Sequence, residues 1–141
     1  LVIDCWEQEP NISRELLQAS AIATPHIAGF SADGKANGTR ACLEQISRFF
    51  GLTLERLGQV VPPAPAQPVI DLNRWTDHRV EQAILTTFDP QFIDRKLRAC
   101  PTDFESFRAH YDHPREYAAY QVRGTNSEEA VLMSALGFCS L

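Results

Sequence analysis

Two short segments near the start of the chain hold residues suited to acid–base chemistry: Asp4-Cys-Trp-Glu-Gln-Glu-Pro10 and Ala23-Thr-Pro-His-Ile-Ala-Gly29. The imidazole ring of a histidine titrates near neutral pH, so His26 is suited to take a proton from a substrate hydroxyl group or to return it. A neighbouring carboxylate holds such a ring in one orientation and stabilises its protonated form. We therefore expect Glu9 to be the partner of His26.

Two predicted strands position these residues. Residues 1–5 form an apolar strand, residues 21–23 form a second short strand, and the helix between them begins at Asn11 or Ser13. This order is typical of the last unit of a doubly wound parallel sheet, whose sites lie beyond the carboxyl ends of the strands. Both strands end at the segments described above, so the predicted sheet brings the carboxylate and the imidazole into contact.

The residues of both segments resemble the D-2-hydroxyacid dehydrogenase family. That family has an aspartate at a strand end, a glutamate five residues later ahead of a proline, and a Thr-Pro-His-Ile/Val-Ala signature; Asp4, Glu9 and His26 occupy these places. The resemblance implies a Rossmann-type fold, NAD as the cofactor, His26 as the general acid/base and Glu9 as its catalytic partner. It further implies that Asp4 and Gly29 contact the cofactor and that Phe30 lies at the substrate.

Within the family, the segment from His26 to Thr39 is most similar to members that serve pyridoxal 5'-phosphate biosynthesis, act on a phosphorylated 2-hydroxy acid and carry an extra C-terminal dimerisation domain. Phe30 departs from these members, which often have a tyrosine there near the substrate phosphate, so one hydrogen bond to the phosphate is lost. The arginine that binds substrate in this family corresponds to no residue of this chain. The same holds for the acidic residue that selects NAD over NADP.

The length of the chain limits how much of such an enzyme it can contain. A two-domain NAD-dependent dehydrogenase needs roughly twice the 141 residues present. None of the seven glycines forms the Gly-x-Gly-x-x-Gly turn that binds a dinucleotide. We expect the chain to be an inactive C-terminal fragment of such an enzyme, with residues 1–31 poorly packed or paired with another chain. The alternative is a self-standing dimerisation module derived from the family, in which residues 1–31 belong to a complete core and this chain alone covers residues 1–3 on both sides.

The sequence predicts three parts. Residues 1–31 are the incomplete C-terminal end of a dinucleotide-binding domain, and residues 32–61 are a long helix with an extension that returns to the substrate domain. Four prolines between residues 62 and 68 mark a boundary, since they exclude regular helix and central strand. Residues 62–141 are expected to form a homodimer, because so small a core gains from association. The expected fold class is an α/β tail of a Rossmann-type domain followed by a small α+β dimerisation domain.

Local signals predict the elements that follow the first part. A helix from about residue 33 to residue 50 has Ser31 as its cap and Gly51 as its stop signal. Later elements are a strand at 69–72, a helix capped by Thr76 or Asp77 that runs to 87, a helix from Pro90 to Cys100, a helix at 102–110 with a Thr102–Glu105 capping box, a strand at 116–122, a helix capped by Asn126 or Ser127 that runs to 136, and a short final strand.

The composition of the chain restricts the classes of molecule that it is expected to bind. The net charge of −5 argues against nucleic acid or an anionic membrane, and no apolar run approaches the length of a membrane span. The four cysteines are far apart and have no histidine at ligand spacing, so we expect no metal site and reduced, mostly buried thiols. The expected location is the cytoplasm, and the expected ligand is a small molecule.

Overall fold

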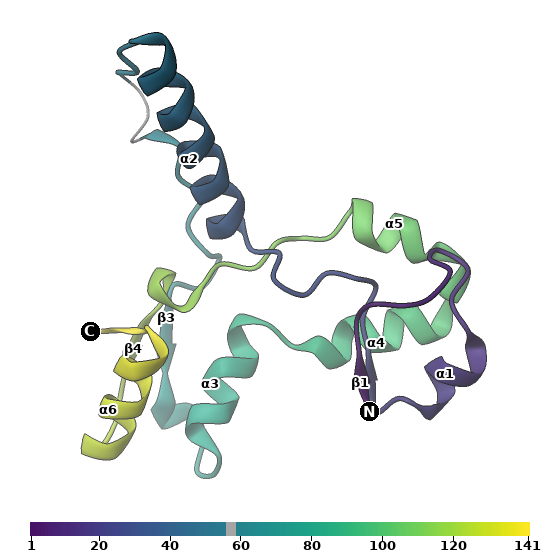
Figure 1. Ribbon diagram of the computed structural model, residues 1–141. Helices are drawn as coiled ribbons and strands as arrows, with labels where there is room; N and C mark the ends of the chain where they lie inside the picture. The colour runs from purple at the N-terminus through teal and green to yellow at the C-terminus, as the bar shows by residue number, and fades with distance from the viewer. Residues whose placement is uncertain (56–58) are drawn as a thin grey trace. The chain divides into compact units, whose positions relative to one another are not determined.

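The computed structural model describes residues 1–55 and 59–141, which divide into two compact units (Figure 1). The first unit joins Leu1–Gly29 to Phe88–Asp112, and the second joins Phe30–Thr87 to His113–Leu141. The boundary predicted after residue 31 lies close to the start of the second unit, whereas the boundary near residue 61 stays a prediction. The predicted extension at 51–58 falls partly outside the described residues.

The first unit begins with a β–α–β arrangement. Its elements are β1 (Val2–Ile3), α1 (Arg14–Ala19) and β2 (Ile22–Ala23). The two strands pair in parallel, with Ile3 opposite Ala23, and α1 begins after Ser13, whose Oγ accepts a hydrogen bond from the Leu16 amide at 3.2 Å. The predicted order of elements is confirmed. A sheet of two strands does not by itself show a doubly wound fold, so the Rossmann assignment stays a prediction.

Two further helices complete the first unit. They are α4 (Pro90–Ala99) and α5 (Phe104–Ala109), with a 3₁₀ turn, η3 (Pro101–Asp103), between them. The Asp89 side chain caps α4 by accepting from the Gln91 amide, and Pro90 occupies the first turn as predicted. Apolar side chains from both parts of the unit form one core: Trp6, Ile12, Leu17, Ala23, Leu97 and Phe104.

A partly buried ion pair attaches α4 to β2. Asp94 Oδ1 accepts a hydrogen bond from the Ala23 amide at 2.8 Å, and Arg98 Nε lies 2.9 Å from both oxygens of Asp94. Arg98 also donates to the carbonyl oxygens of Leu17 and Ser20, at 2.6 and 2.8 Å. The pair therefore satisfies backbone groups at the end of α1 and on the strand that leads to His26.

The second unit is a small α/β structure. Its elements are α2 (Ala32–Phe50), β3 (Val69–Asp71), η2 (Leu72–Arg74), α3 (Arg79–Thr87), η4 (Tyr117–Ala119), β4 (Gln121–Arg123), α6 (Ser127–Leu136) and β5 (Cys139–Ser140). The strands form one parallel sheet in the order β3-β4-β5. The α+β prediction is corrected here, because parallel strands joined through helices are the α/β pattern.

Several local predictions are confirmed and others are wrong. Asn126 forms a full capping box with Glu129, and the chain stops α6 at Gly137 with a φ of 99°. The capping box predicted for Thr102 and Glu105 is absent, because residues 101–103 form a 3₁₀ turn that begins at a proline. The thiols of all four cysteines are exposed and unpaired, contrary to the predicted burial, since they lie on loops, at a helix end and on open faces.

An ion pair ties the start of α2 to the loop before η4. Ser31 caps α2, and Gly51 ends it with a left-handed φ of 64°, both as predicted. Arg115 binds Asp33 in a two-pronged contact, with Nε and Nη2 at 2.8 and 2.9 Å from the two carboxylate oxygens. Ala36 is the single buried residue of this helix, so α2 has little packing beyond its first turns. In residues 1–55 and 59–141, no helix has the length and apolarity that crossing a membrane requires.

Candidate acid–base site

The structure brings His26 and Glu9 into direct contact. Nδ1 of His26 lies 2.9 Å from Oε1 and 2.8 Å from Oε2 of Glu9. Both residues are on loops that leave the parallel strands β1 and β2, and the His26 amide donates to the Asp4 carbonyl oxygen at 2.9 Å. The carboxylate side chain is 18% exposed and the imidazole 42%. The predicted contact is present, and its catalytic role stays a prediction.

The contact determines which ring nitrogen is available for chemistry. An ionised carboxylate only accepts hydrogen bonds, so Nδ1 of His26 carries the proton that it donates to Glu9. Nε2 has no hydrogen-bond partner in the described part of the chain, and the ring is partly exposed. In the neutral ring Nε2 is therefore a base that faces outward, and in the protonated ring it is an acid.

The backbone at the pair is held in an uncommon conformation. His26 has a φ of 55° and Gln8, next to Glu9, has a φ of 61°, both in the left-handed region. A residue with a side chain in this region costs on the order of 1 kcal/mol, and such residues cluster at functional sites. The surrounding hydrogen bonds must offset this cost, and they hold both loops in the conformation that brings Glu9 and His26 together.

Trp6 is the residue that links the two loops. Its amide donates to Glu9 Oε1 at 2.9 Å, and its indole Nε1–H donates to the Thr24 carbonyl oxygen at 2.9 Å. The indole is buried in the core of the first unit. Trp6 therefore positions Glu9 directly and His26 through the backbone two residues before it.

Asp4 organises the turn that follows β2. Its Oδ1 accepts from the Thr24 hydroxyl at 2.6 Å and from the Ile27 amide at 2.8 Å, and its Oδ2 accepts from the Ala28 amide at 3.1 Å. These three hydrogen bonds give Asp4 a structural role as the cap of this turn, and that role competes with the predicted contact to the cofactor. A carboxylate offers about four lone-pair positions, so one on Oδ2 remains for a ligand.

The other two predicted site residues lie at the junction of the units. Gly29 has a φ of 81°, which favours glycine, and a Cβ built there meets no atom within 4 Å. Glycine is therefore favoured at position 29 by the backbone conformation and not by a lack of space for a side chain. Phe30 begins the second unit, where its ring lies edge-on to His113 with 6.2 Å between centroids. Its predicted role at the substrate stays a prediction.

Electrostatics keep Glu9 ionised. Burial alone raises the pKa of Glu9, but hydrogen bonds from His26 and the Trp6 amide, with the charges of His26 and Arg108, bring it below its ordinary value. Arg108 lies on α5, which sequence reasoning did not connect with the site. Burial, with the charges of Asp4 and Asp112, raises the pKa of Tyr111 to about 12, so this phenol stays neutral at physiological pH.

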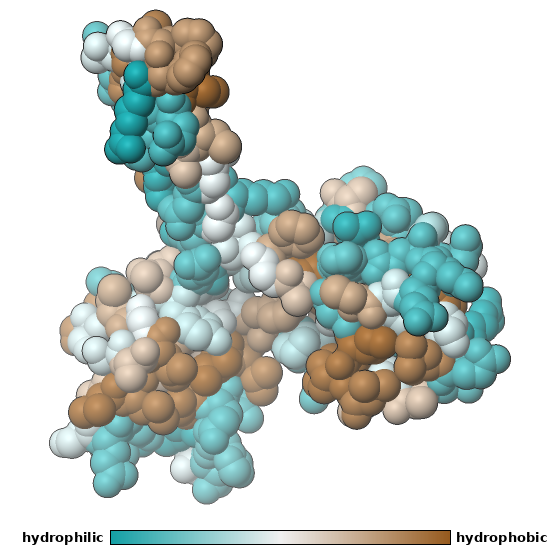
Figure 2. Space-filling model, in the orientation of Figure 1, coloured by the Kyte–Doolittle hydropathy of each residue, from teal (hydrophilic) through white to brown (hydrophobic). Residues whose placement is uncertain are grey.

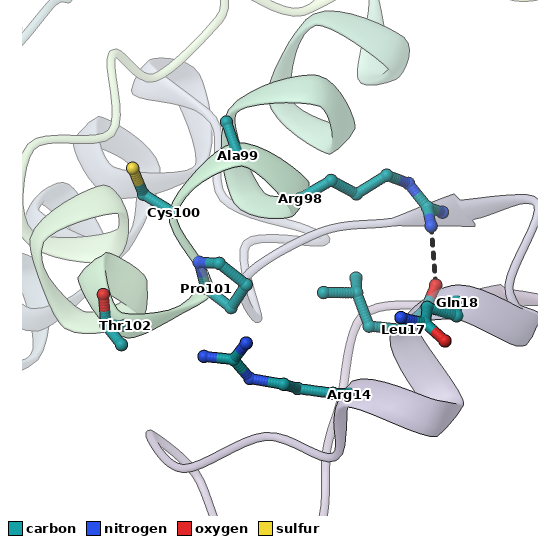
Figure 3. Close-up of a pocket in the computed structure, with 8 residues that line it drawn as sticks. All are labelled: Arg14, Leu17, Gln18, Arg98, Ala99, Cys100, Pro101 and Thr102. Carbon is teal, nitrogen blue, oxygen red and sulfur yellow. Dashed lines mark hydrogen bonds between the residues drawn. The ribbon is translucent and has the colours of Figure 1, made fainter.

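A surface pocket of about 380 Å³ lies elsewhere in the first unit, between α1 and the end of α4 (Figure 3). Its lining residues are Arg14, Leu17, Gln18, Arg98, Ala99, Cys100, Pro101 and Thr102. Arg98 points its guanidinium at the Leu17 carbonyl oxygen and is neutralised by Asp94, so one of the two arginines there is already occupied. Neither His26 nor Glu9 lines the pocket. No group of three or more metal-binding side chains occurs within the described ranges.

The sequence predicted the contact between His26 and Glu9 but not the residues that support it. The missed residues are Trp6, Thr24, Asp94, Arg98 and Arg108. Trp6 lies between two predicted site residues, and the pair Asp94 and Arg98 has the spacing of one helical turn, so both had a local signal. Arg108 had none, because its place near Glu9 depends on how α5 packs.

Comparisons with known proteins agree with the motif. Residues 60–137 match a family described as a domain of unknown function, DUF3410. The chain is 55% identical to erythronate-4-phosphate dehydrogenase of Porphyromonas gingivalis over 140 aligned residues. The aligned region is 99% of this chain and 38% of that protein. The erythronate-4-phosphate dehydrogenase of Bacteroides thetaiotaomicron is 46% identical over a region that is 87% of this chain and 33% of that protein. The enzyme of the same name from Edwardsiella ictaluri is 35% identical over 98% of this chain and 38% of that protein. The chain thus spans less than two fifths of the length of these relatives.

Proposed function

Because the chain belongs to the DUF3410 domain family, we propose that it is the C-terminal portion of an NAD-dependent erythronate-4-phosphate dehydrogenase. Such an enzyme oxidises the C2 hydroxyl of 4-phosphoerythronate to a ketone in pyridoxal 5'-phosphate biosynthesis. The observation that carries the proposal is the hydrogen bond of 2.8 Å between His26 and Glu9 in loops that match the family signature. The chain alone is proposed to be inactive, because the Gly-rich turn for the dinucleotide is not among its residues.

His26 and Glu9 have distinct roles in the proposed mechanism. During oxidation, His26 Nε2 takes the proton of the C2 hydroxyl as the C2 hydride leaves, so the ring becomes an imidazolium. Glu9 holds Nδ1–H throughout and stabilises the positive charge that develops on the ring. In the reverse direction the imidazolium returns the proton to the carbonyl oxygen. Arginine for the substrate carboxylate comes from the remainder of the protein.

NAD supplies the hydride acceptor in this proposal. Asp4 fits a place beside the nicotinamide, because one lone-pair position on Oδ2 remains after it caps the turn at Ala28. Gly29 leaves open space where a side chain would stand, which permits a close approach of the cofactor. The free, exposed cysteines fit a protein of the reducing cytoplasm.

Exposed apolar surfaces favour this reading over a self-standing module. The first segment is not poorly packed as expected, because it shares a core with α4 and α5. Its first strand is nevertheless open: Val2 of β1 is 70% exposed and Leu1, just before it, is 67% exposed, although such a strand is usually covered on both faces. At the far end of α2, Phe49 and Phe50 are also exposed. We infer that other parts of the complete protein cover these surfaces, with α2 leading back to the substrate domain.

A direct assay tests the proposal. The complete protein is expected to reduce NAD with 4-phosphoerythronate, followed at 340 nm, and to be much slower with D-glycerate, a 2-hydroxy acid of the same type that lacks this phosphate. Residues 1–141 alone are expected to give no turnover. Failure of the complete protein to oxidise 4-phosphoerythronate under conditions where it binds NADH would exclude the proposed activity.

We further propose that the second unit forms a homodimer through α6. This helix exposes Val131 and Leu132, and the neighbouring C-terminal residue Leu141 is 65% exposed. Figure 2 shows hydrophobic side chains gathered on the face of the molecule that includes this helix. An apolar helix face left to water fits a surface that a second copy covers.

Charge on this face is expected to weaken the dimer. The double change Val131→Lys and Leu132→Lys should raise the dimer dissociation constant about tenfold or more, because two apolar contacts are lost and two ammonium groups lose water. Analytical ultracentrifugation of the complete protein measures the change. Gln82→Lys, at an exposed polar position of α3, is the matched control and should leave the constant unaltered. An unchanged dissociation constant in the double variant would move the interface elsewhere.

A further inference from the structure

The acid–base pair is held in place by a core to which residues about 80 positions later in the chain contribute. Trp6, whose two N–H groups hold Glu9 and the Thr24 carbonyl oxygen, shares its core with Leu97 of α4 and Phe104 of α5, and both of these side chains are fully buried. The core that fixes Trp6 is therefore completed by residues of the DUF3410 match. This segment does more than connect strands of the second unit.

Arg108 lies one helical turn after Phe104. Among residues 1–55 and 59–141, it is the one residue besides His26 whose charge lowers the pKa of Glu9. Within the described chain its Nε is buried without a hydrogen-bond partner, and its contact with Glu105 is a loose one at 3.6 Å. A weak surface pair of this kind contributes little to stability, so the position of Arg108 is not explained by the fold alone.

We propose that α5 is a positioning element of the acid–base site: Phe104 packs in the core that holds Trp6, whose two N–H groups fix Glu9 and the Thr24 carbonyl oxygen, and Arg108, one turn later on α5, adds a positive charge that acts on Glu9. This proposal rests on the proposed function. It assigns to the C-terminal domain a role in the chemistry in addition to association. Neither residue touches the reacting atoms, so both act through Trp6 and Glu9.

The sign of the electrostatic effect follows from the charges. Within the described part of the chain, the charged groups that act on Glu9 are His26, from the loop after β2, and Arg108, from α5. Removing the cation of Arg108 makes it easier for the Glu9–His26 pair to hold an additional proton. Oxidation of a hydroxy acid needs the pair without that proton, so the acidic limb of the pH profile should move to higher pH.

Arg108→Gln in the complete enzyme tests this step. The acidic limb of kcat/KM for oxidation is expected to move to higher pH, because the positive charge that favours the ionised Glu9 carboxylate is lost. Arg108→Lys, which keeps the charge, should restore the profile, and Arg95→Gln, at an exposed arginine of α4, should leave it unaltered. An Arg108→Gln profile that coincides with the wild type would overturn the role of Arg108.

A readout independent of turnover separates this inference from the proposed function. Carboxyl ¹³C NMR of the complete protein, with the Glu9 signal assigned by Glu9→Gln, should show a higher pKa of Glu9 in Arg108→Gln. If the enzyme does not oxidise 4-phosphoerythronate but this shift occurs, the inference stands and the substrate is wrong. If turnover occurs and the pKa of Glu9 does not move, the inference fails.

Phe104→Leu tests the packing step. The smaller side chain should loosen Trp6, so exchange of its indole N–H with solvent should accelerate, and kcat should fall about threefold to tenfold with little change in the KM for NAD. Phe92→Leu is the matched control, because that ring is 50% exposed on α4. Unchanged indole exchange and unchanged kcat in Phe104→Leu would show that the core does not position the pair.

Discussion

Asparagine in place of His26 is expected to lower kcat of the complete enzyme by about 10²–10⁴-fold, the usual contribution of a positioned acid–base group. An amide can donate a hydrogen bond to Glu9, but it does not take the substrate proton at neutral pH. NADH binding, measured by fluorescence titration, should be retained. The His26 side chain contacts Glu9, whereas Asp4 holds the turn at Ile27, so the substitution leaves that turn intact. Steady-state NAD reduction with 4-phosphoerythronate gives kcat.

His78→Asn is the matched control for this prediction. His78 also has a left-handed backbone, with a φ of 50°, and is exposed, so both variants place asparagine in a conformation that asparagine tolerates. Its kcat should equal that of the wild type. A second comparison is Glu9→Gln, which keeps the shape of the pair but removes the charge that stabilises the imidazolium, so it should mainly move the pH optimum. A His26→Asn enzyme with kcat near the wild type would end the acid–base assignment.

The contact between His26 and Glu9 could be predicted from the sequence because its signal is local. Asp4, Glu9 and His26 lie in two short segments, and parallel pairing of the strands before them dictates that their carboxyl ends meet. The supports of the pair depend on long-range packing instead. Arg108 and Phe104 carry no motif, and only the position of α5 against Trp6 reveals their relation to Glu9.

The predictions of the fold show the same difference between local signals and long-range contacts. Helices with strong caps, such as α2 after Ser31 and α6 after Asn126, begin where the sequence predicts, because a cap depends on residues three positions apart. Predictions that needed tertiary information were wrong: the burial of the cysteines and the α+β class of the second unit. The parallel arrangement of β3, β4 and β5 follows from chain direction, which residue periodicity does not report.

The second large effect is expected on stability. Asp94→Asn should lower the free energy of local unfolding around β2 by about 2–3 kcal/mol, because it leaves the partly buried guanidinium of Arg98 without its counter-ion. The asparagine oxygen can still accept from the Ala23 amide, so the loss reports mainly the charge. Native-state hydrogen exchange of the Thr24 and His26 amides, which donate to carbonyl oxygens of the first strand and its end, measures the local value.

The pH dependence of this loss separates charge from packing. Burial alone raises the pKa of Asp94, but hydrogen bonds from Arg98 and the Ala23 amide outweigh it, so the pKa of Asp94 in the folded protein lies below its ordinary value. The stabilisation is therefore present above about pH 4, the range of an unfolded aspartate, and is lost as the pH falls through the folded pKa. The difference between wild type and Asp94→Asn should shrink on acidification over that range. Asp103→Asn, at an exposed carboxylate of η3 that caps nothing, should stay within about 0.5 kcal/mol of the wild type. A loss for Asp94→Asn that is equally large in acid would mean that packing, not the ion pair, attaches α4 to β2.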